Sequence, residues 1–143
     1  MAETVDEANQ MMRLLRRLTT LADATLASAG EVLAEFGLTV SAASLLCALD
    51  PRAETPTMRD LSRQMRCDPS TISLMADKLD RSGLVERRPH PTDGRKRTLA
   101  LTDRGVEVWA ALSARLGETS ALAVLSVEER RTLEELLAKA QSG

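Results

Sequence analysis

The sequence has 143 residues, a formal net charge of −2 and 43% hydrophobic residues, which predicts one domain with enough chain to bury a core. Its first residues are acidic and lack an apolar run, so no signal peptide is expected, and no segment has the ~20 apolar residues that span a bilayer. We therefore expect a cytoplasmic protein with no membrane partner. Its two cysteines, Cys47 and Cys67, argue against a disulfide framework in that compartment.

The N-terminal third is expected to be helical. Residues 5–35 form one long predicted helix, bent near Gly30, whose apolar residues recur with helical spacing. These are Met11, Leu14, Leu15, Leu18, Leu21, Ala22 and Leu26, and the other side carries Arg13, Arg16, Arg17 and Asp23. A second helix is predicted to begin at Ser41 and to cover residues 42–49, where Asp50-Pro51 stops it. Pro56-Thr57 is expected to form a short strand and a cap before a helix over residues 58–65.

The next helix is the most informative element. Asp68-Pro69 is a strong helix start, because aspartate can cap free N–H groups and proline suits the first helical position. One face carries the apolar stripe of Ile72, Met75, Ala76 and Leu79, and Gly83 ends the helix. The opposite face and its flanks carry Ser70, Thr71, Ser73, Leu74, Asp77, Lys78 and Arg81. A helix with small polar groups, a leucine and cations on its outer face suits the DNA major groove.

A basic hairpin is predicted to follow. Residues 84–88 and 97–101 alternate as two antiparallel strands, and the loop 89–96 is rich in turn formers and cations. Between Arg81 and Arg104, seven Arg and Lys residues outnumber three acidic ones. A charge run alone is more often a solvated face. Its position directly after a helix–turn–helix instead indicates a wing that contacts the phosphates of double-stranded DNA.

The C-terminal region is expected to serve in assembly. A helix is predicted from Thr102 to about Leu122, and Ser126 with Glu129 forms a capping box for the last helix. The apolar residues of these two helices are Val106, Trp109, Ala110, Leu112, Leu116, Ala123, Leu133, Leu136, Leu137 and Ala140. The apolar faces at both chain ends predict a two-fold homodimer with intertwined termini. A monomeric helical bundle is the alternative.

Three runs carry a resemblance to a known family. Residues 80–87 (DRSGLVER), 91–95 (PTDGR) and 101–105 (LTDRG), with Gly37-Leu38-Thr39 and Asp60-Leu61 upstream, resemble the MarR family of bacterial transcriptional regulators. The resemblance implies a mainly α fold with a small β-hairpin wing. It also implies a DNA-binding lobe over residues 38–104 and helical dimerisation regions over 1–37 and 105–143. The expected function is a homodimeric repressor of a pseudo-palindromic operator, relieved by a small phenolic or other anionic effector.

The same resemblance implies roles for individual residues. In the wing signature, Asp93 orients Arg95, which enters the minor groove of A·T tracts. The full set of expected DNA-binding residues is Ser70, Thr71, Ser73, Leu74, Lys78, Arg88, Asp93, Arg95 and Arg97. Leu74 departs from the polar or basic residue common in the family, and it can pack against a thymine methyl group. For the effector, the expected residues are Arg16 and Arg17 as anion partners, Ser44 as a hydrogen bonder and Trp109 as an apolar wall.

Neither catalysis nor a metal or other cofactor is expected. The only histidine is His90, and no metal-ligand cluster, phosphate loop or nucleophile elbow is present in the sequence. Phe36 and Trp109 are the only aromatic residues, which excludes a stacking platform for single strands. Two alternatives stay open. One is a redox-sensing regulator of the same fold that uses Cys67 or Cys47, and the other is a winged-helix protein-interaction module that does not bind DNA.

Overall fold

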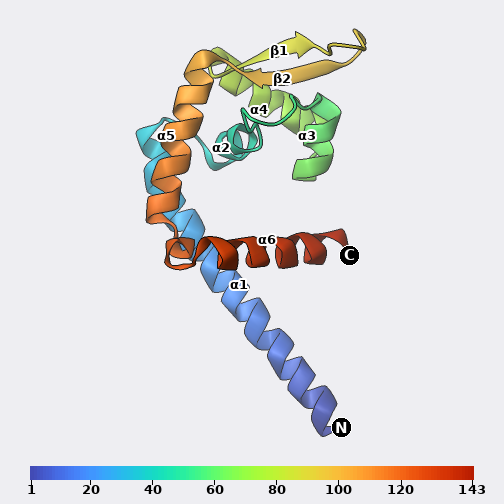
Figure 1. The fold of residues 1–143 in the computed structure, drawn as a ribbon, viewed down its shortest axis with the longest axis vertical. Coiled ribbons are helices and arrows are strands. Elements are labelled where there is room, and N and C mark those ends of the chain that lie inside the picture. The colour runs from blue at the N-terminus through green and yellow to red at the C-terminus, as the bar shows by residue number, and fades with distance from the viewer. The chain divides into compact units, whose positions relative to one another are not determined.

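The computed structural model describes residues 1–143, apart from the side chain of Ala2. The chain forms six α-helices, one short 3-10 helix and a two-stranded antiparallel sheet, which confirms the expected mainly α fold class. Figure 1 labels the α-helices and the two strands. In chain order they are α1 (Ala2–Glu35), α2 (Val40–Cys47), α3 (Met58–Met65), α4 (Pro69–Arg81), β1 (Val85–Pro89), β2 (Arg97–Leu101), α5 (Asp103–Thr119), η1 (Ala121–Val124) and α6 (Val127–Ser142).

The chain divides into two compact units. Unit 1 consists of Met1–Ala29 with Leu116–Gly143, and unit 2 consists of Gly30–Arg115. The boundary at Gly30 falls within α1, which continues through this residue without interruption. Unit 2 includes residues 38–104 and extends beyond them at both ends.

The core lies in unit 2, where α4 packs against α2, α3 and β1. The apolar stripe expected on α4 is buried, which confirms the face that the spacing predicted. Its four residues are at most 6% exposed: Ile72, Met75, Ala76 and Leu79. Leu45 and Leu46 of α2, Leu61 of α3 and Leu99 of β2 complete this core, so the helix–turn–helix and the strands share one hydrophobic interior.

Several expected helix ends are wrong. α2 begins at Val40 rather than after Ser41, because the Thr39 hydroxyl accepts from the Ala42 N–H at 3.2 Å and caps the helix earlier. It ends at Cys47, short of Leu49. α4 starts at Pro69 as expected, but the Asp68 carboxylate makes no capping hydrogen bond, so the fixed backbone of Pro69 carries the start.

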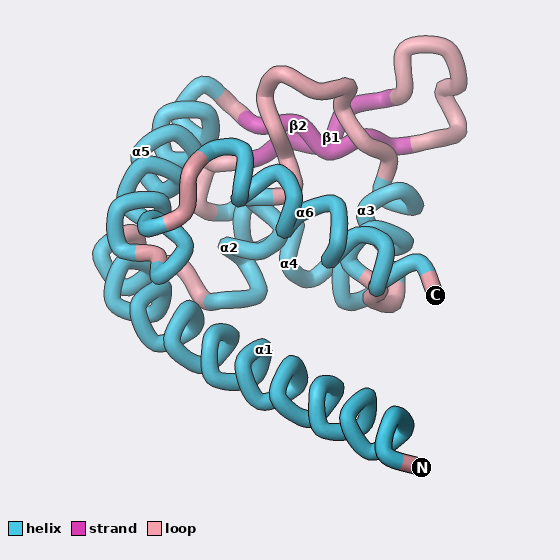
Figure 2. Tube along the Cα trace, turned by 60° about the horizontal axis from the view of Figure 1, so that its bottom comes forward, coloured by secondary structure: helices cyan, strands magenta, loops and turns pink.

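The wing is a β-hairpin whose register pairs Val85 with Leu101 and Pro89 with Arg97. The first strand starts one residue later than expected, because the Leu84 N–H donates to Leu79 O at the end of α4. Gly83 supplies the left-handed turn there, with φ of 71°. Figures 1 and 2 show the loop of this hairpin projecting beyond α3.

A tight joint connects the end of α4 to the start of α5. The Thr102 hydroxyl donates to Gly83 O at 2.6 Å, and the Gly105 N–H donates to Thr102 Oγ1 at 3.0 Å. A Cβ at position 105 would lie 1.9 Å from Leu84 O, so only glycine lets the helix approach this closely. α5 then ends at Thr119, not at about Leu122, because Ser120 caps the 3-10 turn η1.

Unit 1 has little apolar burial of its own. In α1, Met11, Leu14, Leu15, Leu18 and Leu26 are about half exposed, and in α6 Leu136 is 60% exposed. The capping box of Ser126 and Glu129 at the start of α6 is present, as expected. No single helix of the described chain is long and apolar enough to span a membrane, although residues 3–35 and 40–48 could do so as a bent pair, by length and composition only.

Candidate nucleic-acid interface

The outer face of α4 is exposed and mostly polar. Ser70, Thr71 and Lys78 are exposed, and Leu74 is exposed by 64%. The helix phase placed Leu74 opposite the buried stripe, and the structure confirms that this leucine is not part of the core. An exposed leucine among small hydroxyls provides an apolar contact on an otherwise polar surface.

An arginine that the sequence reading left without a role ties the wing to this helix. Arg87 of β1 forms an ion pair with Asp77 of α4, with Nη2 2.7 Å from Oδ1, and donates to the backbone O and Oγ of Ser73 at 3.3 Å. These groups are partly exposed, so the pair adds little stability. The contacts of Arg87 instead hold the wing against α4. They also use part of the hydrogen-bonding capacity of the Ser73 hydroxyl.

The wing loop is organised by His90 and Asp93. The Nδ1 atom of His90 accepts from the backbone N–H groups of Thr92 and Asp93, both at 3.2 Å, which places the hydrogen of the neutral ring on Nε2. The Asp93 carboxylate accepts from the Arg95 N–H at 3.1 Å. Asp93 thus orients Arg95 by accepting a hydrogen bond from the Arg95 backbone. No ion pair joins the two side chains in the described residues.

A basic hollow, which sequence reasoning missed, lies between the start of α3 and the loop end of the wing. It has a volume of about 450 Å³ and is lined by Thr57, Met58, Arg59, Asp60, Arg63, His90, Lys96 and Arg97. Hydrogen bonds from the backbone and side chain of Thr57 lower the pKa of Asp60, and the charges of Arg63 and Lys96 lower it further. The four cations around this hollow outnumber its one carboxylate, that of Asp60, and make a site that suits a phosphate group.

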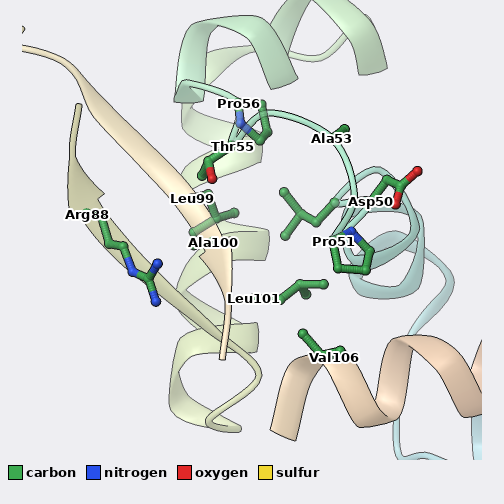
Figure 3. A pocket seen from close by; sticks show the side chains of 11 residues that line it. Asp50, Pro51, Ala53, Thr55, Pro56, Arg88, Leu99, Ala100, Leu101 and Val106 are labelled. Carbon is green, nitrogen blue, oxygen red and sulfur yellow. The ribbon is translucent and has the colours of Figure 1, made fainter. Parts of the chain in front are cut away.

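Arg88 is exposed but already paired. Its guanidinium forms an ion pair with Glu86 of the same strand, with Nε 2.7 Å from Oε1. It also lines a cavity of about 170 Å³ between the loop after α2, β2 and the start of α5, where Figure 3 shows Leu101 close to Val106. Most of the residues that line this cavity are apolar, although several of them are exposed.

The four expected effector residues fall in both units. Arg16 and Arg17 line a hollow on α1 of unit 1, together with Thr20, Leu21 and Ala24. In unit 2, the Ser44 hydroxyl donates to Val40 O at 2.9 Å. The Nε1 atom of Trp109 is buried and has no hydrogen-bond partner in the described residues. A buried indole N–H without a partner within the chain costs free energy.

Comparison with known proteins shows which proteins share this architecture. The family model of the MarR family matches residues 38–96. The apo structure of MarR from E. coli is 26% identical, with a TM-score of 0.66 over 89% of this chain and 96% of that chain. The chain carries a MarR-family domain over residues 38–96. It is therefore a winged-helix, DNA-binding transcriptional regulator, and the family expected from the three sequence runs is confirmed.

Two further structures of the family are informative about partners. A variant of MarR from E. coli was solved in complex with operator DNA; it is 26% identical, with a TM-score of 0.67 over 92% of this chain and 96% of that chain. CouR from Rhodococcus jostii RHA1 was solved bound to p-coumaroyl-CoA. It is 25% identical, with a TM-score of 0.73 over 94% of this chain and 92% of that chain. No protein of curated function matches the chain by sequence.

Proposed function

We propose that the protein is a homodimeric repressor that binds a pseudo-palindromic operator with the outer face of α4 and the wing. The observation that carries this proposal is the exposed face of α4, fixed to the cationic wing by Arg87. In the proposed complex, α4 enters the major groove through Ser70, Thr71 and Leu74. Ser73 and Lys78 lie beside these residues, and Arg95 enters the minor groove. Arg88, Asp93 and Arg97 support the wing contacts.

The basic hollow adds a phosphate contact to this proposal. Arg59 and Arg63 of α3 lie beside Lys96 and Arg97 of the wing, so one DNA phosphate seated there would contact both elements at once. Such contacts fix the position of the protein on the duplex without reading sequence. Base and groove readout is left to α4 and Arg95.

Substitution of Arg95 tests the DNA contacts. Arg95→Ala is expected to weaken operator binding by about 1–3 kcal/mol and to reduce discrimination at A·T positions beside each half-site. Arg63→Ala should instead weaken binding to all sequences and reduce the salt slope by about 1. Fluorescence anisotropy on operator and scrambled duplexes, over a range of salt concentrations, separates the two effects. Wild-type affinity in both variants would contradict the interface and favour a protein-interaction module.

We propose that unit 1 is the dimerisation region. The exposed apolar stripe of α1 and the leucines of α6 come from opposite ends of the chain. A second copy is the partner that a self-complementary two-fold interface supplies. The operator would then consist of two half-sites about 34 Å apart, one for each recognition helix.

The proposed effector is a small phenolic or other anion, and its candidate residues are Arg16 and Arg17 in unit 1 and Ser44 and Trp109 in unit 2. Support comes from the p-coumaroyl-CoA bound to CouR. Such a ligand releases DNA only if its affinity differs between two conformations; a tenfold loss of DNA binding requires about 1.4 kcal/mol of difference.

Titration with salicylate tests this effector class. Because Trp109 is the only tryptophan, its fluorescence is expected to change in parallel with release of operator DNA. Arg16→Ala should shift both titrations to higher salicylate concentration. If neither signal moves at millimolar salicylate, and Trp109→Leu leaves DNA affinity unchanged, this effector class does not apply to the protein.

A further inference from the structure

Both cysteines of the chain line a single hollow in unit 2, although they belong to different elements. Cys47 is the last residue of α2, and Cys67 follows α3. The thioethers of Met65 and Met75 line the same hollow, which has a volume of about 620 Å³. The lining of this hollow therefore includes both cysteines and two of the six methionines of the chain.

The hollow has no charged lining residue. Its remaining residues are Val40, Ser41, Ser44, Ala48, Gln64 and Thr71. An anionic ligand would find no cation there, and a hard cation such as Mg²⁺ would find no carboxylate. No group of three or more His, Cys, Asp or Glu side chains in the described residues could hold a metal, which disfavours a structural zinc site.

Soft sulfur ligands select a different ion. Thiolate and thioether donors favour Cu(I) over harder metals. We propose that this hollow binds one Cu(I) ion through the sulfur atoms of Cys47 and Cys67, with Met65 and Met75 as neighbouring thioether donors. On binding, each thiol S–H bond breaks, an S–Cu bond forms, and the proton passes to solvent. The copper keeps its oxidation state throughout.

Burial raises the pKa of the Cys47 thiol, and the Cys67 S–H donates to Met65 O at 3.3 Å. A thiol that stays protonated is a slow nucleophile toward peroxides, which disfavours Cys47 as a redox sensor. A soft metal can displace the proton of a thiol.

An anaerobic competition titration tests the site in the full, reduced chain. Copper(I) is supplied as its bicinchoninate complex, and the loss of that colour measures transfer to the protein. The wild type is expected to take up one Cu(I) per chain and to release two protons. Cys47→Ser and Cys67→Ser should each weaken uptake by at least about tenfold. The matched control is Met58→Leu, a methionine outside the hollow, which should bind as the wild type does.

Two outcomes would overturn the proposal. One is Cu(I) uptake by the Cys47→Ser/Cys67→Ser double variant with wild-type affinity while circular dichroism shows that it is folded. The other is failure of the folded wild type to withdraw Cu(I) from bicinchoninate. Neither measurement involves DNA, so this site is tested independently of the proposed repressor function.

Discussion

Replacing Gly105 by alanine is expected to lower the free energy of unfolding by about 1–3 kcal/mol, because the new methyl group overpacks the joint between α4 and α5. The added Cβ would meet the backbone oxygen of Leu84 at 1.9 Å. A backbone atom cannot swing aside as a flexible side chain can, so α5 must shift. Alanine gains about 0.5–1 kcal/mol over glycine in a helix, which does not offset the clash. Urea denaturation followed by circular dichroism measures the difference.

Gly117→Ala is the matched control, because it makes the same substitution in the same helix. No heavy atom lies within 4 Å of a Cβ at Gly117, so alanine should stabilise the protein by about 0.5–1 kcal/mol through helix propensity. The two variants should therefore shift the denaturation midpoint in opposite directions. Equal stabilisation by both would show that α5 does not approach Leu84 this closely.

The buried face of the recognition helix could be predicted because its signal is local. Four apolar residues at helical spacing, from Ile72 to Leu79, define a stripe that any compact fold must cover. The outward position of Leu74 followed from the same phase. The strand pairing followed from alternation and from the turn-forming loop between the strands. The joint at Gly105 could not be predicted, because the clash there comes from Leu84, which is distant in sequence.

The helix ends were predicted less well because several caps compete. Thr39 and Ser41 are both good N-cap residues, and the helix uses Thr39. Asp68 had the chemistry of a cap but does not use it. By contrast, the capping box of Ser126 and Glu129 has two reciprocal bonds, 2.8 and 3.1 Å long, and its sequence pattern identified it.

The parts of the site that were missed join residues from separate elements. Arg87 reaches Asp77 and Ser73 only because β1 packs against α4. The basic hollow combines Arg59 and Arg63 with Lys96 and Arg97, and no spacing rule connects α3 to the wing. The shared hollow of Cys47 and Cys67 is equally non-local. Sequence periodicity identifies a face of one element, whereas such clusters require the packing between elements.

Deletion of Ser126–Gly143 is expected to abolish the homodimer and, with it, tight operator binding. The deletion removes α6, whose leucines are the proposed partners of the second copy. A fully buried leucine contributes about 1.5–3 kcal/mol, so the loss of several should leave aggregated or unfolded chain. Sedimentation velocity measures the outcome. A soluble and folded monomer of this truncation would show that the chain folds without a second copy, which contradicts an obligate dimer.

Point substitutions separate assembly from folding, since the truncation removes a whole helix. Leu136→Asp/Leu137→Asp is expected to raise the dimer dissociation constant by at least about tenfold, because it places two charges in an apolar interface. In the single chain, Leu136 is 60% and Leu137 is 40% exposed, so neither charge is forced into the monomer core. Lys139→Asp, also exposed on α6, is the control for added negative charge and should remain dimeric. If the leucine variant sediments as a dimer and binds operator as the wild type does, the interface lies elsewhere on the chain.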